Sequence, residues 1–260
     1  MTDAAEASPV LIVGAGPVGL ALAGDLGWRG RRCLVVEQSD GSIYQPRMDF
    51  VGVRTMEFCR RWGLVDAVEH SPYPRDYPQD NMYLTSLNGY ELGRERFPAM
   101  QDEVPLPQSP QHRERCPQNM FDPILLQWCR SMPQQVAMRY RTKLLGFTQD
   151  ADGVSAELEA VESGERETVR VRYLVGCDGA ASRVREVLGI QMQGKPVLTY
   201  TTNVIFRCPD LVKMHDKGKA YRHIFVGPEG TFATIVAING GCRSSVAKRK
   251  RRIRKPTSAP

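Results

Sequence analysis

The feature that most constrains the fold of this chain is a glycine-rich loop near the N-terminus. Residues 10–13 are wholly apolar, as expected of a buried strand in a parallel sheet. Three glycines follow in the spacing Gly-x-Gly-x-x-Gly: Gly14, Gly16 and Gly19. Pro17 stands at the first turn of a helix expected over residues 17–27, and residues 33–37 form a second expected strand. This strand–helix–strand opening predicts a doubly wound α/β domain.

The same loop has the chemistry of a dinucleotide site. The first glycine allows the tight turn, the second lets backbone approach a pyrophosphate, and the third lets helix and strand pack closely. The helix N-terminus adds free N–H groups and a partial positive charge. Glu37 ends the second strand, where a carboxylate accepts hydrogen bonds from ribose hydroxyls. An acid at this position favours FAD or NAD over NADP.

The rest of the chain changes from mixed α/β to β-rich. Residues 71–118 are rich in proline and predict a long loop with short strands. Further helices are expected over 53–69, 119–132 and 181–188. Strands are expected over 138–142, 144–149, 154–161, 168–171, 173–176, 200–207, 221–226 and 231–238.

Composition excludes several classes of protein. The 260 residues contain no run of 18 apolar residues, so no membrane span is predicted, and residues 1–9 lack the apolar segment of a secretory signal. Seven scattered cysteines without a CxxC pair argue against a disulfide framework or a zinc site and predict a cytoplasmic protein. The four histidines show no ligand spacing, so no metal is expected.

The positive charge of the chain is confined to its last residues. Residues 243–260 hold eight Lys or Arg and no acid, which leaves 27 basic against 29 acidic residues before them. Nucleic acid is therefore not expected as a partner of the globular part. The tail predicts either a basic arm for an acidic partner or, as we favour, an aberrant gene end; both predict disorder over 241–260.

Three segments resemble the class A FAD-dependent aromatic hydroxylases, the group of para-hydroxybenzoate and phenol hydroxylases. Pro46-Arg47, Val53-Arg54-Thr55-Met56-Glu57 and Trp62-Gly63-Leu64 resemble the family's second motif. Residues 173–185, which include Cys177-Asp178-Gly179, resemble its "DG" motif nearly residue for residue. Gln118 is placed like a family glutamine near the ribityl-phosphate region of the flavin. The resemblance covers about residues 8–240, and the DG segment is its most specific part.

The resemblance implies roles for individual residues. Arg47 would neutralise the FAD pyrophosphate, and Arg54 would do the same or cap a helix. Asp178, with Gly179, would accept hydrogen bonds from flavin hydroxyls, the alternative being a turn aspartate that binds its own backbone. Asp49, five residues before Arg54, would draw the proton from a phenolic substrate. The alternative for Asp49 is a loop acid with no proton to move.

The family reaction sets the expected function. NADH or NADPH would reduce FAD, O₂ would give the flavin C4a-hydroperoxide, and this species would hydroxylate a phenolic or other aromatic substrate. The expected domains are an FAD-binding domain over 8–190 with an inserted loop and strands at about 71–118, an incomplete β-rich substrate domain beginning over 191–240, and the tail over 241–260.

One family segment is not found. Family members carry, after the substrate sheet, a Gly-Asp pair followed by an Ala-His segment. The Gly-Asp pair of this chain, residues 24–25, lies in the first expected helix and has no such continuation. We therefore expect a C-terminally incomplete, weakly active monooxygenase. The alternatives are a non-catalytic dinucleotide-binding regulator and an FAD reductase of another group.

Overall fold

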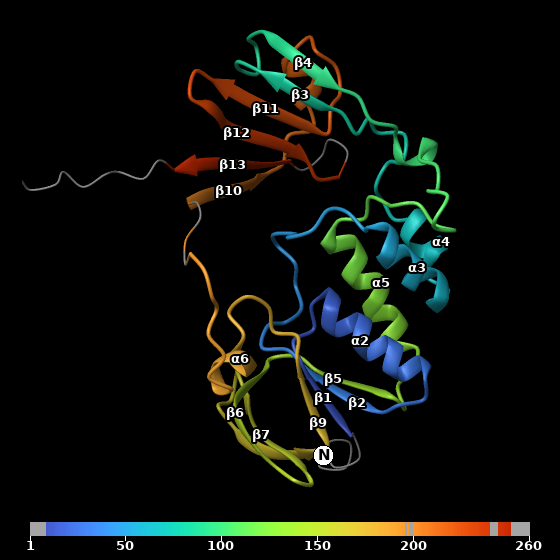
Figure 1. Cartoon of the computed structure of the whole chain (residues 1–260), viewed down its shortest axis with the longest axis vertical. Helices are drawn as coiled ribbons and strands as arrows, with labels where there is room; N and C mark the ends of the chain where they lie inside the picture. The colour runs from blue at the N-terminus through green and yellow to red at the C-terminus, as the bar shows by residue number, and fades with distance from the viewer. Residues whose placement is uncertain (1–8, 196, 198–199, 240–243, 251–260) are drawn as a thin grey trace, which may run out of the picture. The chain divides into compact units, whose positions relative to one another are not determined.

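The computed structural model describes residues 9–195, 197, 200–239 and 244–250 (Figure 1). These residues form two compact units, which are described separately below. Unit 1 comprises residues up to 47, 58–68 and 118–192. Unit 2 comprises residues 48–57, 69–117 and those from 193 on.

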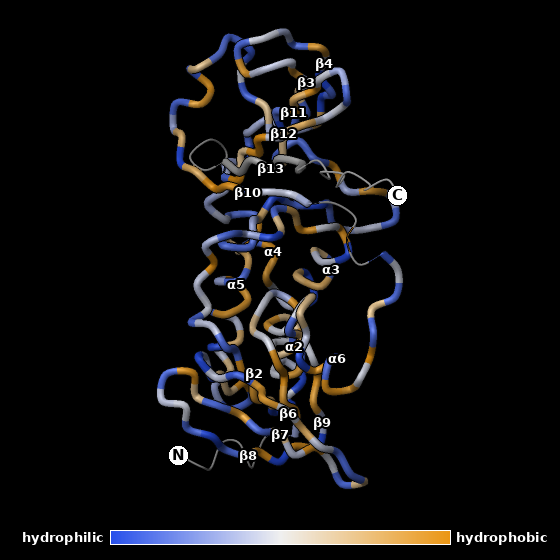
Figure 2. The backbone as a smooth tube through the Cα atoms, turned by 90° about the vertical axis from the view of Figure 1, so that its left-hand side faces the viewer, coloured by the Kyte–Doolittle hydropathy of each residue, from blue (hydrophilic) through white to orange (hydrophobic). Residues whose placement is uncertain are grey.

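Unit 1 is built on a four-stranded parallel sheet in the order β5-β2-β1-β9. The strands are β1 (Val10–Val13), β2 (Cys33–Val36), β5 (Val136–Arg139) and β9 (Tyr173–Gly176). The tube in Figure 2 is hydrophobic along β2, all of whose residues are buried. Buried, uniformly apolar strands of this kind are typical of a parallel sheet covered on both faces, which confirms the predicted Rossmann-like α/β fold.

Helices α2 (Pro17–Trp28) and α5 (Gln118–Arg130) lie side by side over one face of this sheet (Figure 1). Their contact is close, because a Cβ placed on Gly24 would lie only 2.0 Å from the Trp128 ring. Trp62 packs on Trp128 and donates its indole N–H to Asp25 at 2.8 Å.

A three-stranded antiparallel sheet covers the other face of the four-stranded sheet in unit 1. Its strands are β6 (Thr142–Asp150), β7 (Gly153–Ala160) and β8 (Arg166–Val171). Side chains of β1 and β2, such as Leu11 and Leu34, form one buried cluster with Ala156, Leu158 and Val169. The short helix α6 (Arg183–Val187) follows β9 and packs on the same cluster through Val184.

The single helix expected over 53–69 is divided in two. The structure has α3 (Val53–Trp62) and α4 (Val65–Glu69). Gly63 lies between them with φ +74°, and its N–H and that of Leu64 close onto the last turn of α3. Such a left-handed glycine ends a helix, so the expectation of one continuous helix was wrong.

Unit 2 is a six-stranded mixed sheet in the order β10-β13-β12-β11-β3-β4. Its strands are β3 (Asn81–Leu84), β4 (Glu91–Glu95), β10 (Tyr200–Phe206), β11 (Arg222–Gly227), β12 (Gly230–Ala237) and β13 (Ser244–Lys250). Two 3₁₀ turns, Met100–Asp102 and Leu211–Met214, lie in its connections. Met82, Leu84, Ala220 and Phe225 form its buried cluster.

Two features of unit 2 differ from the expected boundaries. The hairpin β3–β4 belongs to the unit 2 sheet rather than to an insertion in the FAD-binding domain, because β3 pairs in parallel with β11. The tail expected to be disordered from residue 241 contains β13, which pairs antiparallel with β10 and β12. That expectation was wrong for 244–250; residues 240–243 and 251–260 lie outside the described residues.

Among the described residues, no helix has the length and apolar character needed to cross a membrane.

Candidate functional site

The glycine loop of unit 1 is shaped by two contacts that only glycine permits. Gly14 has φ +105°, and a Cβ there would lie 2.5 Å from the carbonyl oxygen of Cys177. A Cβ on Gly19 would lie 1.9 Å from the carbonyl oxygen of Gly14. Both distances are far below van der Waals contact, so the packing of the protein itself requires glycine at these two positions.

Gly16 differs from its two neighbours in the motif. It has an ordinary extended conformation, with φ −74°, and a Cβ there would meet nothing within 4 Å. Gly16 is the N-cap of α2, Pro17 opens the helix, and the first turn has no side-chain cap and no acidic residue. The backbone here faces open space at the positive end of a helix, which fits a phosphate group.

Glu37 holds the loop from the end of β2. One carboxylate oxygen accepts the N–H of Ala15 and the other accepts the N–H of Ser39, each at 2.9 Å. Each oxygen of an ionised carboxylate has a second lone pair. The half-buried Glu37 side chain therefore fixes the loop and keeps capacity to accept hydroxyl hydrogens.

The Asp178 turn lies directly against the glycine loop. A Cβ on Gly14 would be 3.0 Å from the Asp178 nitrogen, and Gly179 turns the chain with φ +77°. The Asp178 Oδ2 atom accepts the N–H groups of Arg183 at 2.7 Å and Val184 at 3.1 Å, so it caps α6. The Oδ1 atom is buried and has no partner among the described residues. An unpaired buried acceptor costs about 1–3 kcal/mol, so a donor from a ligand would stabilise it.

Arg47 and Gln118 are joined through the backbone. The Arg47 N–H donates to the Gln118 side-chain oxygen at 2.9 Å, and the Gln118 amide donates to Asp122 at 3.0 Å. Burial raises the pKa of Asp122 to about 6. This chain of contacts fixes the loop at the start of α5 and leaves the Arg47 side chain exposed.

The remaining two predicted site residues, Asp49 and Arg54, belong to unit 2. Arg54 is exposed and pairs with Glu57 at 2.7 Å, on the helix that both residues share. Glu57 also accepts the Ser109 hydroxyl at 2.8 Å. The structure thus brings nine predicted residues together in unit 1: Gly14, Gly16, Pro17, Gly19, Glu37, Arg47, Gln118, Asp178 and Gly179.

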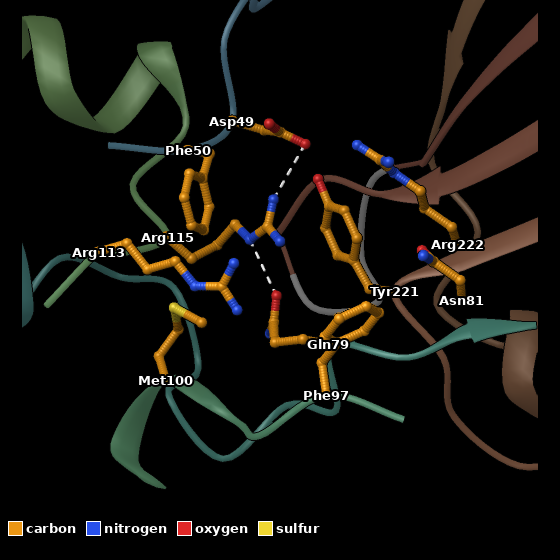
Figure 3. A pocket seen from close by; sticks show the side chains of 10 residues that line it. All are labelled: Asp49, Phe50, Gln79, Asn81, Phe97, Met100, Arg113, Arg115, Tyr221 and Arg222. Carbon is orange, nitrogen blue, oxygen red and sulfur yellow. Dashed lines mark hydrogen bonds and ion pairs between the residues drawn. The ribbon is translucent and has the colours of Figure 1, made fainter. Parts of the chain in front are cut away.

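Asp49 lines a cavity of about 290 Å³ inside unit 2 (Figure 3). Its carboxylate pairs with Arg115 at 3.2 Å, and Arg115 also donates to Gln79 at 2.9 Å. The Arg115 guanidinium lies over the Tyr221 ring, 3.7 Å from its centre. Burial lowers the pKa of Arg115, and Asp49 opposes that shift. Asp49 is therefore a positioned acid in a cavity with aromatic walls, not an isolated loop residue.

The sequence did not indicate the partners of Asp49. Gln79, Arg115 and Tyr221 come from three segments far apart along the chain, each without a motif. The alternation Arg113-Glu114-Arg115 in a proline-rich stretch was the available signal, since Glu114 and Arg115 are almost fully buried. Buried charges require partners and often mark a site.

A second charged cluster in unit 2 combines Glu69, His112 and Glu114. The His112 Nε2 atom lies 3.3 Å from Glu69, and candidate ligand atoms of all three residues lie within 4.8 Å of one another. Arg75 pairs with Glu114 at 2.9 Å, so a guanidinium already compensates its charge. We interpret the cluster as an ion-pair network.

Comparison with known proteins identifies the family. The sequence model of the FAD binding domain family matches residues 7–257. A 2,4-dichlorophenol 6-monooxygenase of Delftia acidovorans is 34% identical over 208 residues, which are 78% of this chain and 35% of that protein. A phenol 2-monooxygenase of a Pseudomonas strain is 32% identical over 187 residues, covering 70% of this chain and 30% of that protein.

Solved structures of flavin-dependent enzymes are also similar to this chain. The rebeccamycin biosynthetic enzyme RebC with reduced flavin has a TM-score of 0.85 and 32% identity, covering 94% of this chain and 46% of RebC. Aklavinone-11 hydroxylase in complex with FAD and aklavinone has a TM-score of 0.80 and 32% identity, over 96% of this chain and 47% of the hydroxylase. This chain thus spans about a third of the curated relatives quoted above and just under half of these two structures. It belongs to the class A flavoprotein monooxygenases that resemble phenol and dichlorophenol hydroxylases.

Proposed function

We propose that unit 1 binds FAD, and that the chain is the FAD-binding part of an NAD(P)H-dependent monooxygenase that hydroxylates a phenolic substrate. One observation carries the proposal. The open backbone at Gly16, at the uncapped start of α2, lies on the same loop that packs against Asp178, whose Oδ1 has no partner in the described part of the chain. These groups fit a pyrophosphate and a hydroxyl donor, which FAD combines in one molecule.

Each predicted residue of unit 1 has a role in this proposal. Gly14 and Gly19 shape the loop, while Gly16 and Pro17 present the helix start to the pyrophosphate. Glu37 and Asp178 accept hydrogen bonds from ribose and ribityl hydroxyls, and Gly179 turns the chain so that Asp178 faces the loop. Arg47 and Gln118 bind the charged and polar part of the cofactor. The cofactor role of Arg54, which belongs to unit 2 and pairs with Glu57, stays a prediction from the resemblance.

Asp49 has the role of proton acceptor for the substrate hydroxyl. A phenol that loses its proton to a carboxylate becomes more electron-rich at the ring. Arg115, 3.2 Å away, orients the Asp49 carboxylate through their ion pair. When bound, FAD supplies the transfer of one oxygen atom from O₂ to the ring, with NAD(P)H as the electron source.

The test is the flavin absorbance of the purified chain after mixing with FAD and gel filtration. We expect the chain to retain flavin and the D178N variant to lose it. In that variant the amide oxygen can still cap α6, but an NH₂ group replaces the free acceptor. The matched control is D152N, a similar change at an exposed turn residue, which should retain flavin.

A colourless wild-type chain, or D178N that retains flavin as well as the wild type, would contradict the FAD proposal. NAD(P)H consumption coupled to the appearance of a catechol from phenol then tests the reaction itself. The chain with FAD bound should show this coupling at a low rate, as expected of a weakly active monooxygenase, and the D49N variant should lose hydroxylation while it retains FAD.

A further inference from the structure

The loop that carries Arg47 depends on few contacts with the rest of unit 1. Residues 38–47 contain no regular helix or strand. Over residues 43–47, one hydrogen bond joins this loop to another segment in the part of the chain that the structure describes: the Arg47 N–H donates to the Gln118 side-chain oxygen at 2.9 Å. The position of Arg47 therefore depends on the orientation of one amide side chain at the start of α5.

The Gln118 amide has one orientation that satisfies both of its contacts. Its oxygen faces a donor, the Arg47 N–H, and its NH₂ group faces the Asp122 carboxylate, with a nitrogen–oxygen distance of 3.0 Å. An ionised carboxylate accepts hydrogen bonds and donates none. A rotated amide would place two donors together at Arg47 and two acceptors together at Asp122. Asp122 thus fixes which end of the amide faces the Arg47 loop.

Asp122 makes no other hydrogen bond and no ion pair with the residues that the structure describes. It is only 6% exposed, and its Oδ1 atom is buried without a described partner. Burial raises the pKa of this carboxyl to about 6, which leaves it ionised at pH 8. A buried charge without a cation beside it destabilises the folded chain. The single hydrogen bond of this destabilising group is the one that orients Gln118.

We propose that Asp122 is a positioning residue for FAD, which orients the Gln118 amide and thereby holds the loop whose Arg47 guanidinium binds the pyrophosphate. Asp122 acts through Gln118 rather than on the cofactor. The inference rests on the proposed function, since it adds a residue to the FAD site of unit 1. It predicts that one change at Asp122 raises the stability of the chain and weakens FAD binding at the same time.

The experiment compares D122L, D122N and the wild type at pH 8, by urea unfolding and by quenching of flavin fluorescence on binding. Leucine has nearly the shape of aspartate but neither acceptor. D122L should therefore unfold at a higher urea concentration and bind FAD about three- to tenfold more weakly, the loss that one hydrogen bond accounts for. D122N keeps an amide oxygen for the Gln118 NH₂ group. It should share the gain in stability and bind FAD like the wild type.

The matched control is Q127L, which introduces leucine at an exposed position of the same helix. It should leave the affinity for FAD unchanged. Three results would overturn the proposal: D122L that binds FAD like the wild type, D122N that binds as weakly as D122L, or D122L that loses stability and affinity together. The last result would mean that Asp122 only supports the packing of α5.

A measurement without FAD separates failure of this inference from failure of the proposed function. Hydrogen exchange of the Arg47 N–H, followed by NMR, reports its contact with Gln118 directly. We expect exchange about three- to tenfold faster in D122L than in the wild type, and wild-type exchange in D122N. A wild-type chain that binds no FAD refutes the proposed function, while this exchange pattern still supports the linkage from Asp122 through Gln118 to Arg47. Unchanged exchange in D122L overturns the linkage, whatever the chain binds.

Discussion

The glycine loop allows ligand binding to be separated from folding by two substitutions of the same kind. In the G16A variant the added methyl group meets nothing within 4 Å, and φ −74° suits alanine as well as glycine. Alanine is less favourable than glycine at an N-cap by about 0.5–1 kcal/mol. It also lowers the entropy of the unfolded chain by about 0.4–1 kcal/mol. The two effects oppose each other, so the free energy of unfolding should change by no more than about 0.5 kcal/mol.

The same methyl group should weaken FAD binding. It occupies the space through which a pyrophosphate reaches the backbone of α2, so the affinity for FAD should fall at least about tenfold, or ~1.4 kcal/mol. The G19A variant is the contrasting change. Its Cβ would lie 1.9 Å from the carbonyl oxygen of Gly14, and neither backbone segment can move without disturbing the contact between α2 and β1. We expect a loss of about 3 kcal/mol of stability or more.

Two measurements on each variant decide the matter: urea unfolding followed by tryptophan fluorescence, and FAD affinity followed by quenching of flavin fluorescence. The expected pattern is a stable G16A variant that binds FAD poorly and an unstable G19A variant. The reasoning is refuted if G16A binds FAD like the wild type, or if G16A is destabilised as much as G19A. The latter result would mean that Gly16 serves packing, as Gly14 and Gly19 do.

Three further changes test single side chains. The Y221F variant removes a buried hydroxyl that has no partner among the described residues, so urea unfolding should show about 1 kcal/mol more stability; unchanged stability would contradict the cost of the unpaired hydroxyl. Burial lowers the pKa of His223 from its ordinary 6.5 to about 4, so the folded state resists protonation. Stability should therefore be retained above pH 6.5 and fall by about 2 kcal/mol between pH 7 and pH 5, a fall that is absent in H223F. Burial raises the pKa of Asp122 from 3.8 to about 6, so this group stabilises the fold below pH 3.8 and loses that contribution as the pH rises through 6. D122N should accordingly be more stable than the wild type by about 2 kcal/mol at pH 8 and similar to it at pH 4; equal stability at pH 8 would refute the shift.

The parts of the fold that the sequence predicted are those specified by neighbouring residues. The first strand–helix–strand unit depends on an apolar run, a glycine turn and a proline within 27 residues of one another, and it appears at the expected positions. The break at Gly63 was missed because a helical pattern continues on both sides of it. Only the left-handed backbone of Gly63 shows that the helix ends there.

Pairing between strands far apart along the chain could not be predicted from the sequence in this way. Strand β3 pairs with β11, from Asn81 opposite Arg222 to Leu84 opposite Phe225, and no local pattern specifies a partner so far along the chain. The residues that line the Asp49 cavity were difficult to predict for the same reason. The β3–β11 pairing brings the start of β3 beside the start of β11, so Asn81 and Arg222 line the same cavity. A motif could indicate Asp49, but only the sheet shows that Tyr221 and Arg222 belong with it.

Asp178 shows why two interpretations that compete in a sequence need not compete in a structure. The sequence allowed two interpretations of Asp178: a turn aspartate that binds its own backbone, or an aspartate that binds a flavin hydroxyl. The structure assigns the first task to Oδ2, which accepts two N–H groups at the start of α6. Because that contact fixes the carboxylate, Oδ1 is held buried, where no described residue donates to it. The capping bond is thus what positions the second oxygen for a ligand. This is why D178N, which retains the cap and replaces the free acceptor, separates the two roles where alanine would remove both.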